Sequence, residues 1–378
     1  MASLNTPEQK SEVRHPRATL KLAGKEEPGL VSFTADQNTN YQANTLRAVV
    51  AINAEDGQLQ WPDWATVAKG EDAILEAEIS VGEQGEETPL FVGIIDEFDL
   101  DPAKGVVSLR GRDKTSLLME KKTTEKYAEM YGFAVVEELA KEAGITDLRV
   151  TKDKTLPVVG TYLDGLHASH TTNRSYWDYL TWVAQTENYL LYFDGQTLVY
   201  EPDPAGAGAK ESTADVFHLE FNRADPVRPW SNAESVILRR SLTVSRDILV
   251  EVRSMSLWEG NVRAQARSAL GKRPQTRSAG TDAAQVFTIF TENLDREQAQ
   301  KLAETRARQI TSRQVQLTAT LPGTAKISPK TKVVVQGTGT DFDQDFYVDH
   351  LIRTYEAQRG YSLQLKAKNH ATATTVAP

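Results

Sequence analysis

Short runs in which apolar and polar residues alternate characterise residues 18–113. Clusters of Gly, Pro, Asp and Asn separate these runs, and the combination predicts an antiparallel β domain. The clearest run, residues 74–82, predicts one strand. Two further strands are predicted within residues 90–113, joined by a turn at residues 101–105, DPAKG, because Asp, Pro and Gly favour turn conformations.

Residues 114–200 change to the apolar spacing of helices. Thr124 is a candidate cap for a helix that runs through Tyr131, and residues 133–143 predict a second helix that ends at Gly144. Ser175 is the candidate cap of a third helix.

A hairpin is predicted directly after that third helix, at residues 189–200. Its turn is Asp194-Gly195, and Asp-Gly between apolar runs is a strong hairpin signal because both residues tolerate positive φ. Residues 202–208, PDPAGAG, then predict a linker.

The β pattern returns after Pro229, with one amphipathic helix that starts at Asn293 or Asp295 and runs to Ile310. The basic stretch 263–277 contains five Lys and Arg residues and no acidic residue, and its Gly, Ser and Pro content predicts a surface loop. The predicted strands lie at residues 235–238, 242–244, 248–252, 286–290, 315–321, 332–337, 346–355 and 361–368.

An internal repeat accompanies this pattern, because residues 77–113 fall on residues 333–369 at an ungapped offset of 256. Alternating hairpins produce some such matches by chance, but this one runs over 37 positions without a gap, and both turns fall in step. We interpret the match as one β module used twice. The matched pairs include Ala77 with Val333, Ile79 with Val335, Leu90 with Phe346, Val92 with Val348, Ile95 with Leu351, Val107 with Leu363 and Leu109 with Leu365.

Length and composition narrow the protein classes. A chain of 378 residues predicts two or three domains. The absence of cysteine excludes disulfides, thiolate nucleophiles, iron–sulfur clusters and every cysteine-containing zinc site. The longest near-apolar run, residues 48–52, is far shorter than the roughly 20 residues that cross a bilayer, so we expect no membrane anchor.

Charge is distributed unevenly along the chain. The net charge of −9 argues against nucleic acid as the main partner, since phosphate binding requires a basic face. The net charge is −10 over residues 1–113, −7 over residues 114–225 and +8 over residues 226–378. An acidic first third and a basic last third could attract each other within or between chains, although solvated faces can also drift in composition without function.

The candidate metal and cofactor motifs in the sequence each lack a required residue. His167 and His170 lie in a loop-like stretch without a firm third ligand. The run from Asp341 to Asp345 lacks the glycine and the bidentate glutamate of a calcium loop, and a polar turn explains it better. Gly337 and Gly339 lack the third glycine of a dinucleotide motif. We therefore expect no cofactor and no metal ion.

Catalytic residues are not expected either. Paired carboxylates such as Asp99 with Asp101, or Asp178 with Glu187, could in principle hydrolyse a glycosidic bond, but such pairs are common in acidic chains. A group of aromatic residues could stack on sugars, yet their helix and hairpin spacing favours a small core. These residues are Tyr176, Trp177, Tyr179, Trp182, Tyr189, Tyr192 and Phe193.

The order and spacing of five segments resemble the hub proteins of contractile phage tail baseplates, including the late-control D group and the Mu-like hubs. Together the segments cover most of the chain from about residue 75 onward, whereas the first 70 residues match less clearly. The segments are LFVGIIDEFDLDPAKGVVSLRGRDKTSLL, SYWDYLTWVAQTENYLLYFDGQTLVY, AQKLAETRARQI, ATLPGTAKISPKTKVVVQG and FYVDHLIRTYEAQRGYSLQLKAKN.

The resemblance implies a non-enzymatic homotrimer in which two tube-like β domains per chain alternate in a pseudo-sixfold ring. Such a ring would join the hexameric tail tube protein to a separate trimeric central spike protein, contact other baseplate proteins, and pass DNA only as cargo. The protein would then belong to a virion that is assembled in the bacterial host cytoplasm. The hub of an R-type bacteriocin or another contractile injection system is the alternative. A tail-associated cell-wall hydrolase or glycan-binding component is a more distant one.

The expected fold class is α+β, mainly antiparallel β, with two similar tube-like β-barrel domains flanking a helical-plus-hairpin insert. The expected divisions are a flexible segment 1–16, a first β domain 17–113, the insert and linker 114–225, a second β domain 226–370 and a flexible tail 371–378. From the repeat we expect contacts between copies on two strands. The candidate residues are Phe91, Val92, Ile94, Asp96, Glu97, Phe346, Val348, His350 and Leu351.

Overall fold

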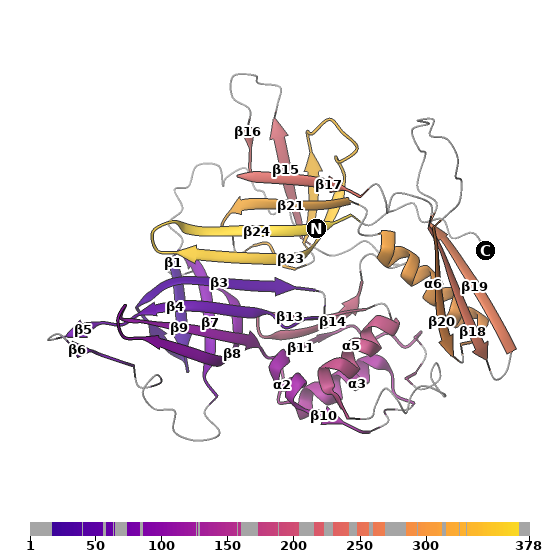
Figure 1. The fold of residues 1–378 in the computed structure, drawn as a ribbon, viewed down its shortest axis with the longest axis horizontal. Coiled ribbons are helices and arrows are strands. Elements are labelled where there is room, and N and C mark those ends of the chain that lie inside the picture. Colours follow the sequence, from indigo (N-terminus) through magenta and orange to yellow (C-terminus); the bar gives the residue numbers. More distant parts are fainter. Residues whose placement is uncertain are drawn as a thin grey trace.

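The structure is a computed structural model of the chain, with elements labelled as in Figure 1. The expected flexible ends, 1–16 and 371–378, lie outside the described residues. The structure describes residues 17–39, 41–55, 58–62, 64, 74–83, 86–125, 127, 129–156, 158–159, 173–187, 189–203, 215–222, 230–241, 248–256, 260–268, 285–292, 294–311, 315–324, 326–329 and 331–369.

One large sheet of 14 strands contains two groups that are distant in sequence. The N-terminal strand group pairs in the order β3-β4-β9-β8-β7-β1-β2, entirely antiparallel. Its strands are β1 (Arg17–Leu22), β2 (Lys25–Glu27), β3 (Leu30–Asn38), β4 (Thr45–Ala51), β7 (Glu76–Glu83), β8 (Glu86–Asp101) and β9 (Val106–Asp113). A separate small hairpin is formed by β5 (Ala54–Glu55) and β6 (Gln58–Leu59).

The C-terminal strand group pairs in the order β17-β21-β24-β23-β22-β15-β16, and only the β15–β22 pair is parallel. Buried and exposed residues alternate along its strands, as in β21, so each strand places one face on a core. The strands are β15 (Val216–Asn222), β16 (Trp230–Ser231), β17 (Ser235–Arg240), β21 (Val315–Pro322), β22 (Lys332–Gln336), β23 (Asp345–Glu356) and β24 (Gly360–Lys368).

Between the two groups in sequence lies a segment with its own core, in which helices pack against a three-stranded sheet. The predicted hairpin is confirmed, and Gly195 in its turn has a φ of 62°. Ser175 Oγ accepts the Asp178 amide hydrogen at 3.1 Å, as the predicted helix cap requires. The elements are α2 (Thr115–Glu120), β10 (Lys122–Thr123), α3 (Gly132–Glu142), β11 (Leu148–Val150), β12 (Arg174–Ser175), α5 (Tyr176–Glu187), β13 (Tyr189–Asp194) and β14 (Thr197–Pro202).

The predicted helix from Thr124 to Tyr131 is wrong within the described residues. The helix before α3 is α2, which precedes Thr124. Thr123 Oγ1 accepts the Glu125 amide hydrogen at 3.0 Å, and this local turn competes with helix initiation. Glu129 has a φ of 65°, which a right-handed helix does not allow.

A second segment with its own core interrupts the C-terminal strand group between β17 and β21. Buried Val262, Ala264 and Ala266 alternate with exposed residues in β19, so the predicted loop is a strand up to residue 268. Residues 269–284 lie outside the described residues. The elements are β18 (Ile248–Ser256), β19 (Gly260–Ser268), β20 (Gln285–Glu292) and α6 (Arg296–Thr311).

The cap of α6 explains where this helix begins. Asp295 Oδ1 accepts the Gln298 amide hydrogen at 2.7 Å, and Gln298 Oε1 accepts the Asp295 amide hydrogen at 3.1 Å. Such reciprocal bonds satisfy donors that a helix start leaves open. The chain is therefore mainly antiparallel β with several sheets, as the sequence predicts.

Candidate assembly interface

The two strand groups are joined by pairing between β23 and β3. This antiparallel junction runs from His350 opposite Asn38 to Glu356 opposite Ser32. It makes one stack of eight strands, from β17 at the top of Figure 1 through β21, β24, β23, β3, β4 and β9 to β8 at the bottom. His350 Nε2 and Asp36 Oδ1 lie 2.6 Å apart across the junction.

A bulge precedes the junction in β23, and β8 contains the same bulge. The extra residue is Asp349 in β23 and Asp96 in β8. The Val348 amide donates to the Thr331 carbonyl at 3.0 Å, and the Ile95 amide donates to the Leu75 carbonyl at 2.9 Å. The strands β23 and β8 therefore stop pairing with the preceding strands, β22 and β7, at equivalent points.

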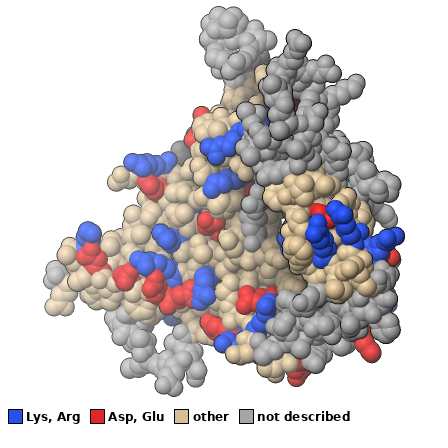
Figure 2. Space-filling model, turned by 45° about the vertical axis from the view of Figure 1, so that its right-hand side comes forward, with Lys and Arg blue, Asp and Glu red and all other residues tan. Residues whose placement is uncertain are grey.

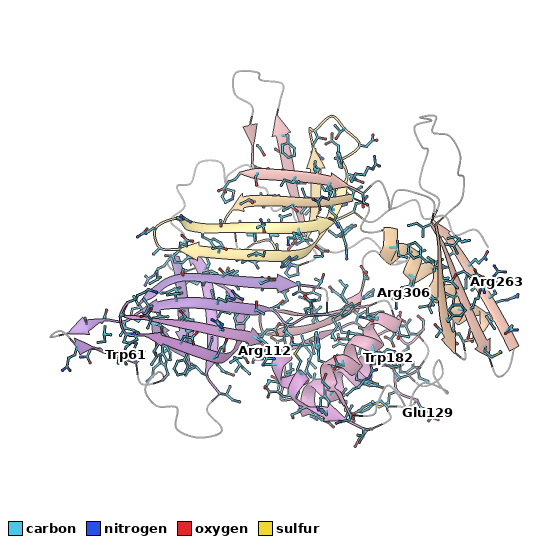
Figure 3. All side chains as sticks on the ribbon, viewed as in Figure 1. Trp61, Arg112, Glu129, Trp182, Arg263 and Arg306 are labelled. Atoms are coloured by element: carbon cyan, nitrogen blue, oxygen red, sulfur yellow. The ribbon has the colours of Figure 1, made fainter. Side chains whose placement is uncertain are left out.

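Equivalent ion pairs flank the two bulges. Arg112 binds Asp96 through two bonds of 2.7 and 2.8 Å, and Lys368 lies 3.8 Å from Asp349. Arg112 also approaches Met119 Sδ of α2 at 3.9 Å, and Figure 3 shows this arginine where the strands meet the helices. Both bulges thus place an aspartate beside a cation of the next strand.

The ends of β9 and β24 carry a further equivalence. The Asn44 amide donates to Asp113 Oδ2 at 3.0 Å, and the Val315 amide donates to Asn369 Oδ1 at 3.3 Å. In return, the amides of Asp113 and Asn369 donate to the carbonyls of Asn44 and Val315. The same side-chain link therefore joins the second and third strands in the pairing order of both groups.

These equivalences correct the ungapped repeat. Asp113 and Asn369 differ by the predicted 256 positions, but the bulge residues Asp96 and Asp349 differ by 253. The middle strand is therefore shifted by three residues, and the matches of Leu90 with Phe346, of Val92 with Val348 and of Ile95 with Leu351 are wrong. The chain is three residues shorter from Val333 to Phe346 than over the equivalent stretch from Ala77 to Gly93, and three residues longer from Asp349 to Asn369 than from Asp96 to Asp113.

Asp113 and Asn369 differ in charge, which predicts a pH effect. Burial raises the pKa of Asp113 to about 6, above its ordinary value of 3.8. The folded state therefore binds this proton more tightly than the unfolded state, and the contribution of Asp113 to stability falls as pH rises from about 4 to about 6. We therefore expect the unfolding free energy of Asp113→Asn, relative to that of the natural chain, to increase by on the order of 2–3 kcal/mol as the pH rises from 4 to 7.

Urea unfolding of both proteins at several pH values measures this difference. The reverse change, Asn369→Asp, is the matched control and should introduce the same pH dependence at the equivalent position. A difference between Asp113→Asn and the natural chain that is constant from pH 4 to pH 7 would contradict the role of the Asp113 carboxylate.

The nine candidate interface residues fall into three environments. Four side chains lie in cores within one copy, so a role for these side chains between copies stays a prediction. His350 lies at the junction, and Glu97 is exposed on β8, where it binds Arg110 at 2.7 Å. The core residues are Phe91, Phe346, Val348 and Leu351; the remaining three, Val92, Ile94 and Asp96, lie on β8.

The two ends of the eight-strand stack have no second strand partner in the described part of the chain. Beyond its bulge, β8 pairs with β9 alone over residues 97–101, which we call the β8 edge. Residues 235–240 pair with β21 alone and form the β17 edge. Leu100 on the first is 43% exposed and Ile237 on the second is 62% exposed. The two edges lie at opposite ends of the stack (Figure 1).

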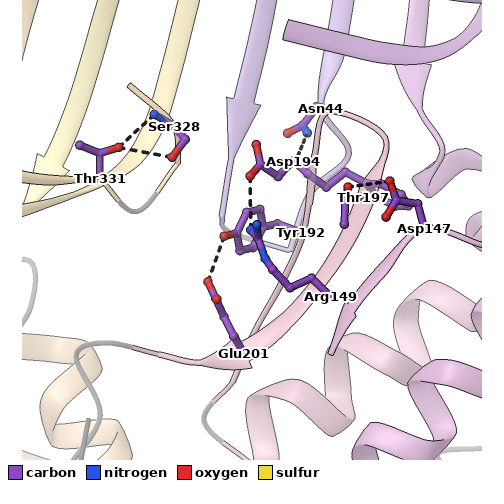
Figure 4. Close-up of polar contacts among 10 residues, drawn as sticks. Asn44, Asp147, Arg149, Tyr192, Asp194, Thr197, Glu201, Ser328 and Thr331 are labelled. Carbon is purple, nitrogen blue, oxygen red and sulfur yellow. Dashed lines mark hydrogen bonds and ion pairs between the residues drawn. The ribbon is translucent and has the colours of Figure 1, made fainter. Parts of the chain in front are cut away.

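Asn44 attaches the N-terminal strand group to the middle segment. Its Nδ2 donates to the Phe193 carbonyl at 3.0 Å (Figure 4), and its Oδ1 accepts the Asn38 amide hydrogen at 3.0 Å. Tyr41 adds two contacts, because its hydroxyl donates to the Tyr189 carbonyl at 2.6 Å and its carbonyl accepts from Trp177 Nε1 at 3.1 Å. The segment is thus fixed by buried polar contacts.

The outer face of the β18–β20 sheet gathers charge. Arg253 lies 3.0 Å from Glu251 Oε1, and Arg263 also pairs with Glu251, so two cations share one carboxylate. Figure 2 shows basic side chains gathered around an acidic one on the face that comes forward at the right. Met255 and Phe290, which are 65% and 76% exposed, lie on the same sheet.

The two carboxylates of the middle segment suggested for hydrolysis, Asp178 and Glu187, do not form a catalytic pair. Asp178 and Glu187 lie in the same helix, α5, nine residues and therefore about 13 Å of helix rise apart, beyond the spacing that glycosidases use. Burial raises the pKa of Glu187 to about 7, and the Tyr200 hydroxyl donates to it. Most of the aromatic residues suggested for sugar stacking are buried in the segment's core, as their spacing predicts.

The described residues contain no cluster of three or more potential metal ligands among His, Cys, Asp and Glu. None of the helices described here has the length and apolar character needed to cross a bilayer.

Comparison with known proteins places this fold. No family model and no curated protein sequence matches the chain. A tail protein from Neisseria meningitidis is similar over 95% of this chain and 98% of its own length, with a TM-score of 0.67 and 17% identity. The 43 kDa tail protein of prophage MuSo2 from Shewanella oneidensis has a TM-score of 0.66 and 14% identity over 95% of this chain and 99% of its own.

A third structural neighbour comes from a related machine. It is an Escherichia coli component of the type VI secretion system, described as similar to the T4 tail proteins gp27 and gp5, with a TM-score of 0.55 and 11% identity over 95% of this chain and 79% of its own. Two of these neighbours are tail proteins and the third is a component of a secretion system. The chain therefore has the fold of these phage tail proteins and of this type VI secretion component.

Proposed function

We propose that the protein is the structural hub of a contractile phage tail baseplate. Three copies form a ring in which the N-terminal and C-terminal strand groups alternate as six similar walls, and residues 114–225 form an insert to one side. The observation that supports this is the same strand order twice in one chain, with matched bulges and an internal junction. A chain with two similar walls lets three copies match a sixfold partner.

In this role the ring joins a sixfold tail tube protein to a threefold central spike protein. It also contacts other baseplate proteins and becomes part of the virion after assembly in the host cytoplasm. DNA passes through the ring as cargo, and a net charge of −9 suits a passage that must not retain it. The protein has no catalytic task in this arrangement.

The hub of another contractile injection system is the second candidate. The Escherichia coli neighbour favours it, because that protein belongs to a type VI secretion system and resembles the present chain over most of both lengths. Purified native particles distinguish the two, since an infectious particle carries DNA and a bacteriocin-type particle does not.

Light scattering of the purified chain tests the ring. We expect a species of about 126 kDa, three times the 41.9 kDa of one chain, at high concentration and low salt. Added salt should shift the equilibrium towards one copy if charges between copies contribute. A single species of one-chain mass at every concentration would contradict the proposed ring.

A further inference from the structure

The internal junction defines how its open counterparts would pair. In the N-terminal strand group, Ala35 of β3 lies opposite Leu46 of β4. The equivalent pair in the C-terminal strand group is Leu238 of β17 opposite Leu317 of β21. This makes β17 the counterpart of β3, just as the matched bulges make β8 the counterpart of β23.

The junction pairs β23 with β3, whereas their counterparts β8 and β17 both keep an open edge in the described part of the chain. We propose that the β8 edge of one copy pairs with the β17 edge of a second copy of this chain, antiparallel and in the register of the internal junction. This register places Asp99 opposite Arg239 and Leu100 opposite Leu238, which correspond to Ile352 opposite Asp36 and Arg353 opposite Ala35. The proposal rests on the proposed ring and names the contact that closes it.

The exposure of apolar residues on the two edges supports a second copy of the chain as their partner. Within the internal junction, Arg353 and Ala35 are 2% and 0% exposed. Leu100, the counterpart of Arg353, is 43% exposed, and Ile237, which precedes the Ala35 counterpart Leu238, is 62% exposed. An open strand edge with exposed apolar residues is a template for another strand, and a second copy supplies the matching one.

The two edges lie at opposite ends of the eight-strand stack, so each copy pairs its β8 edge with one neighbour and its β17 edge with another. The contact is therefore heterologous, head to tail, and it repeats from copy to copy until the ring closes.

The acidic and the basic residue change places between the internal junction and its proposed counterpart. His350 and Asp36 contact each other across the internal junction at 2.6 Å. Their counterparts are Glu97 on the β8 edge and Arg239 on the β17 edge, so the acid now lies on the first strand and the base on the second.

This exchange discriminates against one wrong pairing. If β8 of one copy met β3 of another, Glu97 would face Asp36, and like charges placed opposite each other disfavour that arrangement. Pairing of β8 with β17 avoids this contact, so the exchange favours a ring in which the two strand groups alternate.

Cysteine cross-linking tests the register, because the natural chain contains no cysteine. We expect the variants D99C/R239C and L100C/L238C to form disulfides between copies under mild oxidation, since the two pairs sample both kinds of antiparallel position. The ladder on a non-reducing gel should end at three copies. The matched control D36C/I352C tests the internal junction and should cross-link within one copy.

The outcomes separate this proposal from the proposed ring. If light scattering shows the three-copy species and the internal control cross-links, but neither edge variant links two copies, the register is overturned and the ring stands. If the chain has the mass of one copy at every concentration and no link forms between copies, both are overturned.

Charge reversal tests the exchanged pair. We expect Arg239→Glu to weaken association of the copies by about tenfold, and the double variant E97R/R239E to restore most of the loss. Reversal of exposed Glu138 on α3, far from either edge in sequence, is the control and should leave association unchanged. Equal weakening by R239E and by E97R/R239E would overturn the pairing of these two residues.

Discussion

Replacement of Phe346 by alanine is expected to destabilise the C-terminal strand group by about 3–5 kcal/mol. Phe346 is completely buried and packs in a core with Val333, Leu351 and Leu365. Removing the ring loses its transfer free energy and leaves a cavity, because strands on both sides of β23 hold the surrounding backbone in place.

The N-terminal strand group fills the equivalent space differently. With the three-residue shift, the counterpart of Phe346 is Gly93, and a Cβ there would lie 2.2 Å from the Arg112 carbonyl oxygen and 2.7 Å from the Phe91 ring. Phe91, two residues earlier on the same face, supplies the ring and is 1% exposed. Phe91→Ala should therefore cost a similar amount in its own core.

Urea unfolding measures both truncations. Phe290→Ala is the matched control, because it removes the same atoms from a ring that is 76% exposed, and it should cost less than about 1 kcal/mol. A loss below about 1 kcal/mol for Phe346→Ala would contradict the core that the structure describes.

Replacement of Asn44 by alanine is expected to cost about 2–4 kcal/mol and to loosen the middle segment. The change removes the hydrogen bonds that the Asn44 side chain makes with the Asn38 amide and the Phe193 carbonyl, and Asn44 itself is 2% exposed. Loss of a buried hydrogen-bond partner costs about 1–3 kcal/mol. Because Phe193 belongs to β13, the loss falls on the contact between strands and insert.

Two measurements address this variant. Urea unfolding gives the loss in stability, and limited proteolysis shows whether residues 114–203 become accessible before the strand groups do. Thr45→Ala, a truncation at the exposed neighbouring position, is the control and should change neither. Unchanged protection of the insert in Asn44→Ala would contradict its role as the attachment point.

The sequence predicts strands and helices well where one face of an element is buried. Val107 and Leu109 alternate with less buried residues in β9, and the period of two is visible in the sequence itself. The hairpin at Asp194-Gly195 and the cap at Ser175 are also predicted, because each depends on neighbouring residues only.

Relations between distant segments are less accessible. The three-residue shift of β23 leaves the apolar alternation readable in either register, so only the bulges at Asp96 and Asp349 reveal it. The junction between β23 and β3 joins residues more than 300 positions apart, and no local pattern encodes such pairing. The β17 edge was missed as a candidate interface for the same reason.

The internal junction and the proposed contact between copies differ in how they depend on protein concentration. Because β3 and β23 belong to one chain, they can pair whatever the amount of protein in the cell. The proposed pairing between copies forms only when the protein concentration exceeds its dissociation constant. The internal junction is therefore complete as soon as the chain folds, whereas the proposed ring closes only after enough copies have accumulated.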